Sequence, residues 1–197
     1  MTTLKKGIDI SHYQNPTSWA QVAQSGIDFV FIKLTQGTSF VDPMAITHAN
    51  NARTVNINVG FYHFADTTVN AAVEASFFRS HLANAGDYQL LPVLDIETNK
   101  SSLTPTQIES WIQAFLDAFV DPIILYSYQP FLDQYLPPSH TFGRLPLWLA
   151  QYRAVASPML PIGWATAALW QNTNAGTVPG ISTAVDLDVP LTDDFLR

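Results

Sequence analysis

Short apolar runs separated by polar segments recur along the whole chain of 197 residues. Eight of these runs have nearly continuous hydrophobicity, which is typical of strands that are buried on both faces of a parallel sheet. They cover residues 6–10, 29–34, 58–64, 91–96, 122–127, 147–151, 167–171 and 184–189. The pattern therefore predicts eight strands.

Segments with the apolar spacing of amphipathic helices separate the early strands. We predict helices over residues 19–25, 42–54, 69–85, 104–119 and 130–135. The helix over 104–119 has the clearest start, because Thr104 can cap it, Pro105 suits its first turn and Gln107 occupies the capping-box position. After the sixth strand the intervals are rich in Gly, Pro and Ser and show no helical pattern.

Strand–helix alternation over the first two thirds of the chain predicts a parallel sheet with right-handed crossovers. The sheet could be an open, doubly wound one or a closed barrel. Polar residues gather at the carboxyl end of every predicted strand, which favours an irregular α/β barrel of the TIM type whose last helices are missing. We expect a single domain over residues 1–197, because this length suits one core rather than two.

Composition excludes several functional classes. The net charge of −7 and nine scattered basic residues argue against nucleic-acid binding. The chain contains no cysteine, so disulfides and thiolate metal sites are absent. No apolar stretch reaches the ~18 residues of a membrane span. Residues 1–6 contain two lysines but no apolar run, so we expect no signal peptide.

Two carboxylates close the fourth predicted strand and are the strongest local signal. Asp95 and Glu97 follow four apolar residues, and their i, i+2 spacing places them on one face of a strand. Mutual repulsion should keep a proton on one of them to unusually high pH. A protonated acid beside an ionised one is what glycosidic cleavage needs. An isolated Asp-X-Glu is more often an exposed pair, so this motif does not decide the function alone.

Acids on the first and last strands strengthen that interpretation. Asp9 follows Gly7 and Ile8 in the first predicted strand, and Asp186 lies in the last one. Barrel closure makes these strands neighbours, so we expect the two carboxyls to flank each other near the Asp95–Glu97 pair. Other polar residues at strand ends are Lys33, His63, Tyr126, Gln151 and Gln171.

Aromatic residues also recur near the strand ends, where sugar rings could stack on them. They are Tyr13, Tyr62, Tyr126, Trp148 and Trp170. His63 is either a hydrogen-bonding site residue or a structural one. A metal-hydrolase site made of His12, His63, Asp9, Asp95 and Asp186 is an alternative, but the sequence has no His-X-His or Glu-X-X-His ligand spacing.

Taken together, these motifs resemble glycoside hydrolase family 25, the Chalaropsis-type lysozymes of bacteria, phages and fungi. The resemblance spans essentially the whole chain, with the segments in the family's order and spacing. They are residues 7–14 (GIDISHYQ), 31–38 (FIKLTQGT), 41–43 (VDP), 60–64 (GFYHF), 92–97 (PVLDIE), 147–150 (LWLA), 169–171 (LWQ) and 185–188 (VDLD).

The resemblance implies a barrel of five complete β/α units and three final strands. It implies a muramidase, which cuts the β-1,4 bond between N-acetylmuramic acid and N-acetylglucosamine with retention of configuration and needs no cofactor or metal. Glu97 matches the general acid and base. Asp95 matches the carboxylate that orients the substrate's acetamido group or stabilises the ion that this group forms. Asp9 and Asp186 match two further active-site acids. Tyr62 matches a site tyrosine, and Tyr13, Lys33, His63, Tyr126, Trp148 and Gln171 are candidate substrate-binding residues.

Two positions depart from the family pattern. Asp188 stands where the family commonly has Asn, which would add a charge near the mouth, and Asn172 stands where an aromatic residue is usual. Two alternatives to a muramidase remain, an inactive peptidoglycan-binding barrel and a related glycosidase acting on chitin or another acetamido-sugar polymer. We expect a monomer without a separate wall-binding domain, acting on peptidoglycan as a phage endolysin or as a module of a secreted enzyme.

Overall fold

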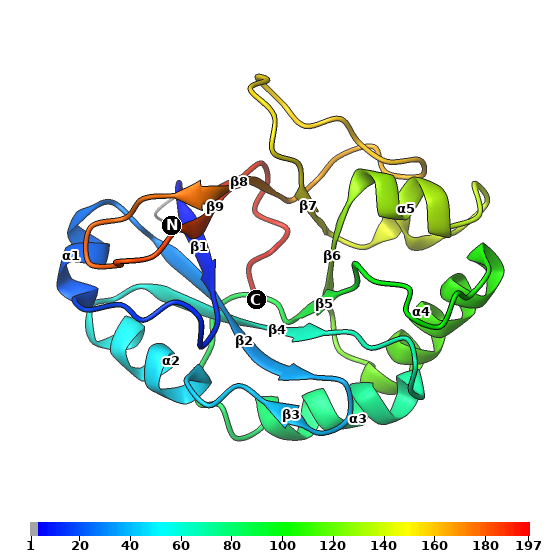
Figure 1. Ribbon diagram of the computed structural model, residues 1–197, viewed down its shortest axis with the longest axis horizontal. Coiled ribbons are helices and arrows are strands. Elements are labelled where there is room, and N and C mark those ends of the chain that lie inside the picture. The colour runs from blue at the N-terminus through cyan, green and yellow to red at the C-terminus, as the bar shows by residue number, and fades with distance from the viewer. Residues whose placement is uncertain (1–3) are drawn as a thin grey trace.

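The computed structural model describes residues 4–197 and shows a closed barrel with helices around it (Figure 1). The expectation about a signal peptide falls partly on residues 1–3, outside the described range. The strands are β1 (Gly7–Ile10), β2 (Phe29–Gln36), β3 (Phe40–Val41), β4 (Asn58–Phe64), β5 (Val93–Asp95), β6 (Ile124–Tyr128), β7 (Leu147–Ala150), β8 (Leu169–Gly176) and β9 (Val185–Pro190). The helices are α1 (Trp19–Gln24), α2 (Ala45–Thr54), α3 (Ala71–Leu82), α4 (Pro105–Phe119), α5 (Gln129–Tyr135) and the 3-10 helix η1 (Phe142–Arg144).

The barrel is closed by pairing of β1 with both β2 and β9. Strands β1, β2, β4, β5, β6, β7 and β8 run parallel in that order. The predicted barrel of five β/α units and three helix-poor strands is confirmed. The short strand β3, which the sequence pattern did not predict, forms an antiparallel hairpin with β2.

The last strand differs from the parallel arrangement that the apolar pattern suggested. β9 is antiparallel to both β8 and β1. Only residues 177–184 connect β8 to β9, and a parallel return needs a crossover of about a dozen residues or more. The chain therefore turns back, so the first residues of β9 lie at the same end of the barrel as the last residues of β1.

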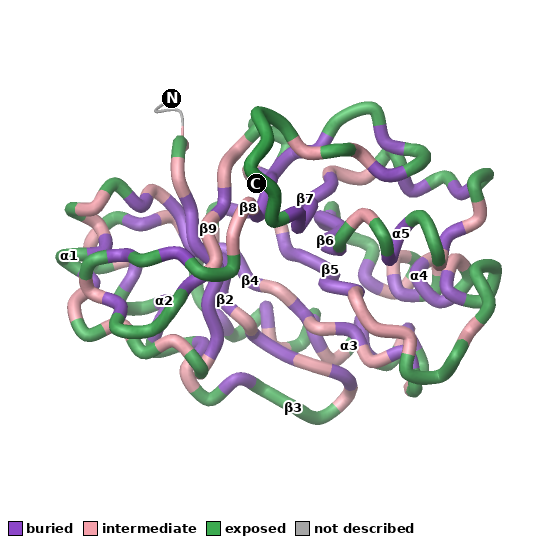
Figure 2. The backbone as a smooth tube through the Cα atoms, turned by 45° about the horizontal axis from the view of Figure 1, so that its top comes forward, coloured by how far each residue is buried: buried purple, intermediate pink, exposed green. Residues whose placement is uncertain are grey.

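Alternation along the strands divides the core into two layers. Phe29 and Phe31 point into the barrel interior, whereas Val30 and Ile32 face the helices. Figure 2 shows the central strands buried and the outer turns of the helices exposed. At the start of α4 the predicted capping box is present, with Thr104 and Gln107 each accepting a hydrogen bond from the other's backbone.

The amino-terminal end of the barrel is filled by side chains. Phe195 is fully buried in the interior cluster, and Leu196 forms a bridge with Leu90. The backbone of β4 approaches Phe31 so closely that a Cβ atom at Gly60 would lie 2.6 Å from its ring. The interior of the barrel is therefore closed at this end and open only at the opposite one. Within residues 4–197, no helix combines the length and the apolar character needed to cross a membrane.

Candidate active site

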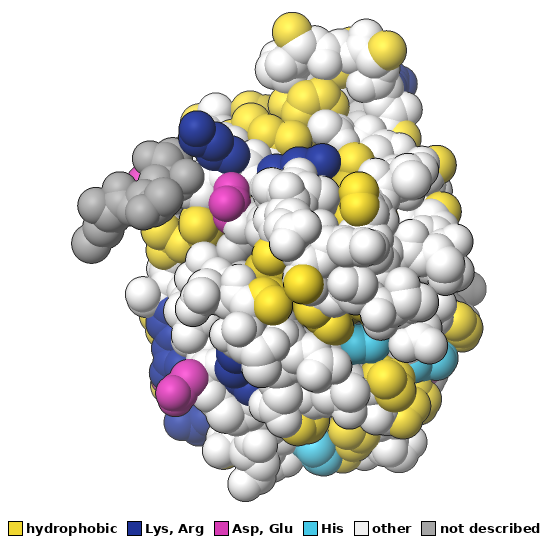
Figure 3. All heavy atoms as spheres, turned by 90° about the vertical axis from the view of Figure 1, so that its left-hand side faces the viewer, with side chains coloured by type: hydrophobic (Ala, Val, Ile, Leu, Met, Phe, Trp, Pro, Cys, Tyr) yellow, Lys and Arg dark blue, Asp and Glu magenta, His cyan; other side chains and the backbone are white. Residues whose placement is uncertain are grey.

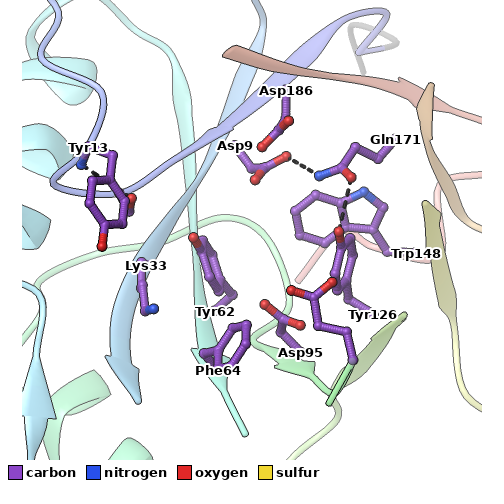
Figure 4. Close-up of a pocket in the computed structure, with 12 residues that line it drawn as sticks. Asp9, Tyr13, Lys33, Tyr62, Phe64, Asp95, Tyr126, Trp148, Gln171 and Asp186 are labelled. Atoms are coloured by element: carbon purple, nitrogen blue, oxygen red, sulfur yellow. Dashed lines mark hydrogen bonds between the residues drawn. The ribbon is translucent and has the colours of Figure 1, made fainter. Parts of the chain in front are cut away.

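A cavity of about 170 Å³ opens at the end of the barrel where the parallel strands finish (Figure 4). We call it the catalytic cavity. It is lined by Asp9, Ser11, Tyr13, Lys33, Tyr62, Phe64, Asp95, Glu97, Tyr126, Trp148, Gln171 and Asp186. All four acids singled out in the sequence thus meet in one place, although they come from β1, β5 with the residues after it, and β9.

Asp95 and Glu97 reach the catalytic cavity because they flank Ile96, whose side chain points into the layer beneath the helices. The segment that follows β5 is held against β6 by two hydrogen bonds. Ser127 Oγ donates to the Ile96 carbonyl at 2.6 Å, and Ile96 N–H donates to the Tyr126 carbonyl. Both carboxyls are thereby held on the same side of the chain.

The electrostatics of this pair favour retention of a proton. Burial raises the pKa of Asp95 well above its ordinary value, and the charge of Glu97 raises it further. Burial likewise raises the pKa of Glu97, followed by the charge of Asp186. Lys33 opposes both shifts. Asp95 Oδ1 is buried and has no hydrogen-bond partner within the protein, so it can accept a hydrogen bond from a bound molecule.

Asp9 and Asp186 are direct partners in the β1–β9 register, as barrel closure predicted. Asp9 Oδ2 accepts a 2.7 Å hydrogen bond from Gln171 Nε2, and Gln171 Oε1 accepts bonds from the hydroxyls of Tyr126 and Tyr152 at 2.9 and 2.6 Å. Burial raises the pKa of Asp9 well above its ordinary value, and the nearby carboxylates add to the shift. This network fixes the orientation of Asp9 in the cavity (Figure 4).

Asp186 reaches the cavity for a different reason from the one the sequence suggested. It is the second residue of β9, not a residue at the carboxyl end of a parallel strand. Its position is correct because the antiparallel strand brings its amino-terminal end to the mouth. Burial raises the pKa of Asp186, and a hydrogen bond with Asp9 counteracts part of the shift.

Asp188 lies behind this cluster and is fully buried. Trp148 Nε1 donates a 2.9 Å hydrogen bond to its Oδ1, while its Oδ2 has no partner. Burial raises the pKa of Asp188 well above its ordinary value. The fourth residue of the VDLD motif was expected to add a charge near the mouth, but the structure places it beneath the cavity, where the charged form is disfavoured.

The aromatic residues form a floor and walls. Trp148 packs against Phe31 and Tyr126, with ring centroids 4.6 and 4.8 Å apart. Burial raises the pKa of Tyr62 well above the ordinary value, so its hydroxyl stays neutral even at alkaline pH. Tyr13 stands at the rim and is 75% exposed, so its ring is free to contact a ligand.

Lys33 is the one cation among the residues that line the cavity. Its ammonium group donates a 2.6 Å hydrogen bond to Gln36 and lies 4.7 Å from the centre of the Phe64 ring. Burial lowers its pKa, although the neighbouring carboxylates raise it. Four of the sixteen acids of the chain thus line this one cavity. On the face drawn in Figure 3, acidic side chains are few and lie apart, and basic ones occupy several separate places.

His63 does not join the site. Since side chains alternate along β4, Tyr62 and Phe64 point into the cavity while His63 points towards the helices. It is fully buried, and its ring nitrogens lie 2.8 Å from Thr35 Oγ1 and 2.7 Å from Glu74 Oε2. Burial lowers the pKa of His63 to about 3 and raises that of Glu74 to about 8. The expectation of a substrate-binding histidine here is therefore not met.

The alternative metal set is also dispersed. His12 pairs with Asp42, its Nδ1 lying 2.8 Å from Oδ2, and His63 lies on the far side of the sheet. Among residues 4–197, no group of three or more His, Asp or Glu side chains is arranged to hold a metal ion.

Three neighbours of the acids were missed in the sequence. Ser11 and Phe64 line the catalytic cavity, and Tyr152 contacts Gln171. Strand alternation could have found the first two, because they stand two residues after Asp9 and Tyr62. Tyr152 lies beyond β7 in an irregular segment, where no pattern fixes the direction of its side chain.

Comparison with known proteins gives a consistent result. The sequence profile described as "Glycosyl hydrolases family 25" matches residues 8–181. The chain is 31% identical over 194 residues to Lysozyme M1 of Streptomyces globisporus, covering 92% of this chain and 66% of that protein. It is 32% identical over 199 residues to the N,O-diacetylmuramidase of Chalaropsis sp., covering 92% and 93%.

Its fold is similar to the crystal structure of the bacterial lysozyme from Streptomyces coelicolor, with a TM-score of 0.87 and 29% identity over 97% of this chain and 94% of that one. The matched span includes Asp9, Asp95 and Glu97. The chain therefore belongs to glycosyl hydrolase family 25 and is a glycoside hydrolase.

Proposed function

We propose that the chain is a muramidase that hydrolyses the β-1,4 bond between N-acetylmuramic acid and N-acetylglucosamine in bacterial peptidoglycan. The observation that carries this proposal is the Asp95–Glu97 pair at the base of a sugar-sized, aromatic-walled cavity. Relatives named lysozyme and N,O-diacetylmuramidase support the choice of substrate.

In the first step, Glu97 gives its proton to the glycosidic oxygen as the bond from that oxygen to the anomeric carbon breaks. The carbonyl oxygen of the substrate's own 2-acetamido group forms a bond to the same carbon. Asp95 accepts a hydrogen bond from the acetamido N–H, a role for which its unpartnered Oδ1 is available. This is the substrate-assisted variant of glycoside hydrolysis.

In the second step, water attacks the anomeric carbon and Glu97 takes its proton. The bond from the acetamido oxygen to that carbon breaks, so the product sugar keeps the β configuration. The raised pKa of Glu97 suits a group that must first hold a proton and then recover one. Asp9 and Asp186 place carboxyl oxygens around the positive charge that forms at the sugar ring.

The proposed substrate places the activity at the bacterial cell wall. We propose that the partner is a peptidoglycan glycan strand and that one copy of the barrel acts alone as a single catalytic domain. Tyr62 and Gln171 bond sugar hydroxyls, Tyr13 and Trp148 contact ring faces, and Lys33 and Tyr126 complete the walls.

The test is mass spectrometry of reduced products after digestion of purified peptidoglycan, with Glu97→Gln as the matched control. Muropeptides ending in reduced N-acetylmuramic acid, absent with the variant, are expected. Products that end in reduced N-acetylglucosamine would show that the protein is a glycosidase that cleaves the other glycosidic bond of the peptidoglycan strand. Products from chitin alone would point to another acetamido-sugar polymer, and no product from several wall types would leave an inactive wall-binding barrel.

A further inference from the structure

Two residues of the sequence motifs, His12 and Asp42, take no part in the proposed chemistry, although they lie beside the mouth of the catalytic cavity. His12 stands between Ser11 and Tyr13, which both line the cavity, and Asp42 belongs to the VDP segment. His12 itself is not a lining residue. Its ring nitrogen Nδ1 instead lies 2.8 Å from Asp42 Oδ2.

Asp42 is a buried anchor that joins three segments of the chain. Its side chain has no exposed surface. Oδ2 accepts a 3.0 Å hydrogen bond from the backbone N–H of His12, and Oδ1 accepts a 2.9 Å bond from the N–H of Met44 at the start of α2. The N–H of Asp42 donates to the Leu34 carbonyl of β2 at 2.9 Å. Asp42 therefore ties the segment after β1 to β2 and to α2.

The ring of His12 lies against the ring of Tyr13. Their centroids are 4.1 Å apart and their planes are inclined by 37°, and the ring of Phe40 in β3 lies 5.8 Å from that of His12. Tyr13 is 75% exposed, whereas the side chain of His12 is only 28% exposed. Because little of the protein surrounds Tyr13, the contact with His12 restrains the direction in which its ring points.

The turn that carries Tyr13 has its own backbone restraints. Gln14 N–H donates to the Ser11 carbonyl at 3.1 Å, and Ser11 N–H donates to Gln14 Oε1 at 3.1 Å. Tyr13 N–H donates to Ser11 Oγ at 3.3 Å. These bonds fix the backbone, but they do not reach the Tyr13 ring. The direction of the ring depends on side-chain contacts, and His12 provides one that is anchored to a buried group.

A restrained aromatic ring costs less to bring into a complex than a free one. A ligand that must order a mobile side chain loses part of its binding free energy to that ordering. An aromatic ring that already faces the ligand avoids the loss and keeps its packing surface available.

We propose that His12 and Asp42 are positioning residues, which hold the Tyr13 ring at the mouth of the catalytic cavity before the glycan binds. Figure 4 shows Tyr13 and Lys33 on the side opposite Tyr126 and Trp148. The held ring thus prepares the wall of the cavity on the Lys33 side. This inference rests on the proposed muramidase function and adds to it the residues that prepare this wall.

The first test is a double-mutant cycle on the peptidoglycan tetrasaccharide of two N-acetylglucosaminyl-N-acetylmuramic acid units. His12→Ala should lower kcat/KM by about two- to tenfold, mainly through a higher KM, because Tyr13 contacts the glycan and not the reacting atoms. In the Tyr13→Ala background, the same substitution should change kcat/KM by less than about twofold, since the ring that His12 supports is gone.

Two further variants separate the anchor from the packing. His12→Phe keeps an aromatic ring beside Tyr13 but removes the nitrogen that meets Asp42, so it should also lower kcat/KM. His81→Ala is the matched control, because His81 packs on Phe77 of α3 with ring centroids 4.4 Å apart and does not line the cavity. This control should stay within about twofold of the parent.

The second test measures the ring itself and needs no activity. Tyr13 is one of seven tyrosines, so its ring carbons can be assigned in ¹³C-tyrosine-labelled protein by comparison with Tyr13→Phe. Nuclear relaxation should show a more mobile Tyr13 ring in His12→Ala and in His12→Phe than in the parent. Circular dichroism melting reports whether each variant is folded.

Three results would overturn the inference: unchanged mobility of the Tyr13 ring in folded His12→Ala, parental kcat/KM of that variant, or an equal loss from His12→Ala with and without Tyr13. Parental behaviour of His12→Phe in both tests would overturn the role of Asp42. Failure of the proposed function looks different, since the unmodified protein would then leave the tetrasaccharide uncut while the ring measurement still reports on His12.

Discussion

Trp148 and Asp188 form a buried pair beneath the acid cluster, in which the indole Nε1 donates a 2.9 Å hydrogen bond to Asp188 Oδ1. Because Asp188 Oδ2 has no partner and the side chain is fully buried, an ionised carboxylate there would leave an uncompensated charge. A neutral Asp188 avoids that charge, in keeping with the burial that raises its pKa well above the ordinary value.

Asp188→Asn tests this protonation state. The amide keeps the acceptor for Trp148 and places N–H donors where the carboxyl would hold its proton. We expect at least about half of the parent's kcat/KM, whereas Asp188→Leu, which removes the acceptor, should lose most activity. Loss of activity in the Asn variant comparable to that in the Leu variant would show that Asp188 works as an anion.

The same variant should alter the pH dependence of stability. A carboxyl whose folded pKa is raised releases its proton more readily in the unfolded chain, so it lowers stability as pH rises above the unfolded pKa of about 3.9. Asp188→Asn should therefore raise the free energy of unfolding at pH 7 by about 1 kcal/mol or more relative to the parent, with a smaller gain at pH 4. Urea titrations at the two pH values measure the difference; a larger gain at pH 4 would contradict it.

Replacement of the catalytic carboxyls should separate chemistry from folding. Glu97→Gln is expected to lower kcat by about 10²–10⁴-fold and Asp95→Asn by a comparable factor, since each loses proton transfer or charge stabilisation. Melting temperatures should not fall. Burial destabilises the charged form of both carboxyls, and the neutral amides do not have that cost. A kcat of Glu97→Gln close to that of the parent would show that Glu97 is not the general acid.

Lys33→Met should move the pH–rate profile upwards. Lys33 lowers the pKa of both Asp95 and Glu97, so its removal raises both. Activity requires one proton on the interacting Asp95–Glu97 pair, so it is lost as pH rises and the pair loses that proton, and it is lost as pH falls and both carboxyls are protonated. Both limbs of kcat/KM should therefore shift to higher pH. A shift to lower pH would show that Lys33 acts in another way.

The hydrogen-bonded pair of His63 and Glu74 should contribute to the free energy of unfolding and not to catalysis. With their pKa values at about 3 and about 8, both groups are neutral in the folded protein between these limits. Glu74→Gln keeps a neutral donor and acceptor, so it should cost less than about 1 kcal/mol at pH 6, whereas Glu74→Ala should cost about 2–4 kcal/mol. Urea unfolding compares the two, with kcat expected to stay near the parent's for Gln. Equal losses in both variants would indicate an ionised Glu74.

The apolar pattern could predict the barrel because each buried strand is a continuous hydrophobic run and each early crossover is an amphipathic helix. It could also predict that Asp9 and Asp186 meet, since closure of any barrel pairs the first and last strands. The direction of β9 was not accessible, because an antiparallel strand buried on both faces has the same apolar run as a parallel one.

Other features depend on contacts between distant residues. Tyr62 and His63 are adjacent in a strand, so they cannot both face the cavity, yet only the packing of α3 against β4 decides which one does. The burial of Asp188 depends on Trp148 covering it. The contact of Tyr152 with Gln171 depends on an irregular segment after β7, where sequence periodicity carries no information.

The antiparallel course of β9 has a practical consequence for the whole molecule. Since β1 begins and β9 finishes at the end of the barrel away from the cavity, residues 4–6 and the segment after Pro190 lie on that closed side. A linker, fluorescent protein or affinity tag joined after Arg197 is therefore attached on the side of the barrel away from the catalytic cavity. An immobilised form of the protein made in this way could still engage an insoluble polymer through its active face.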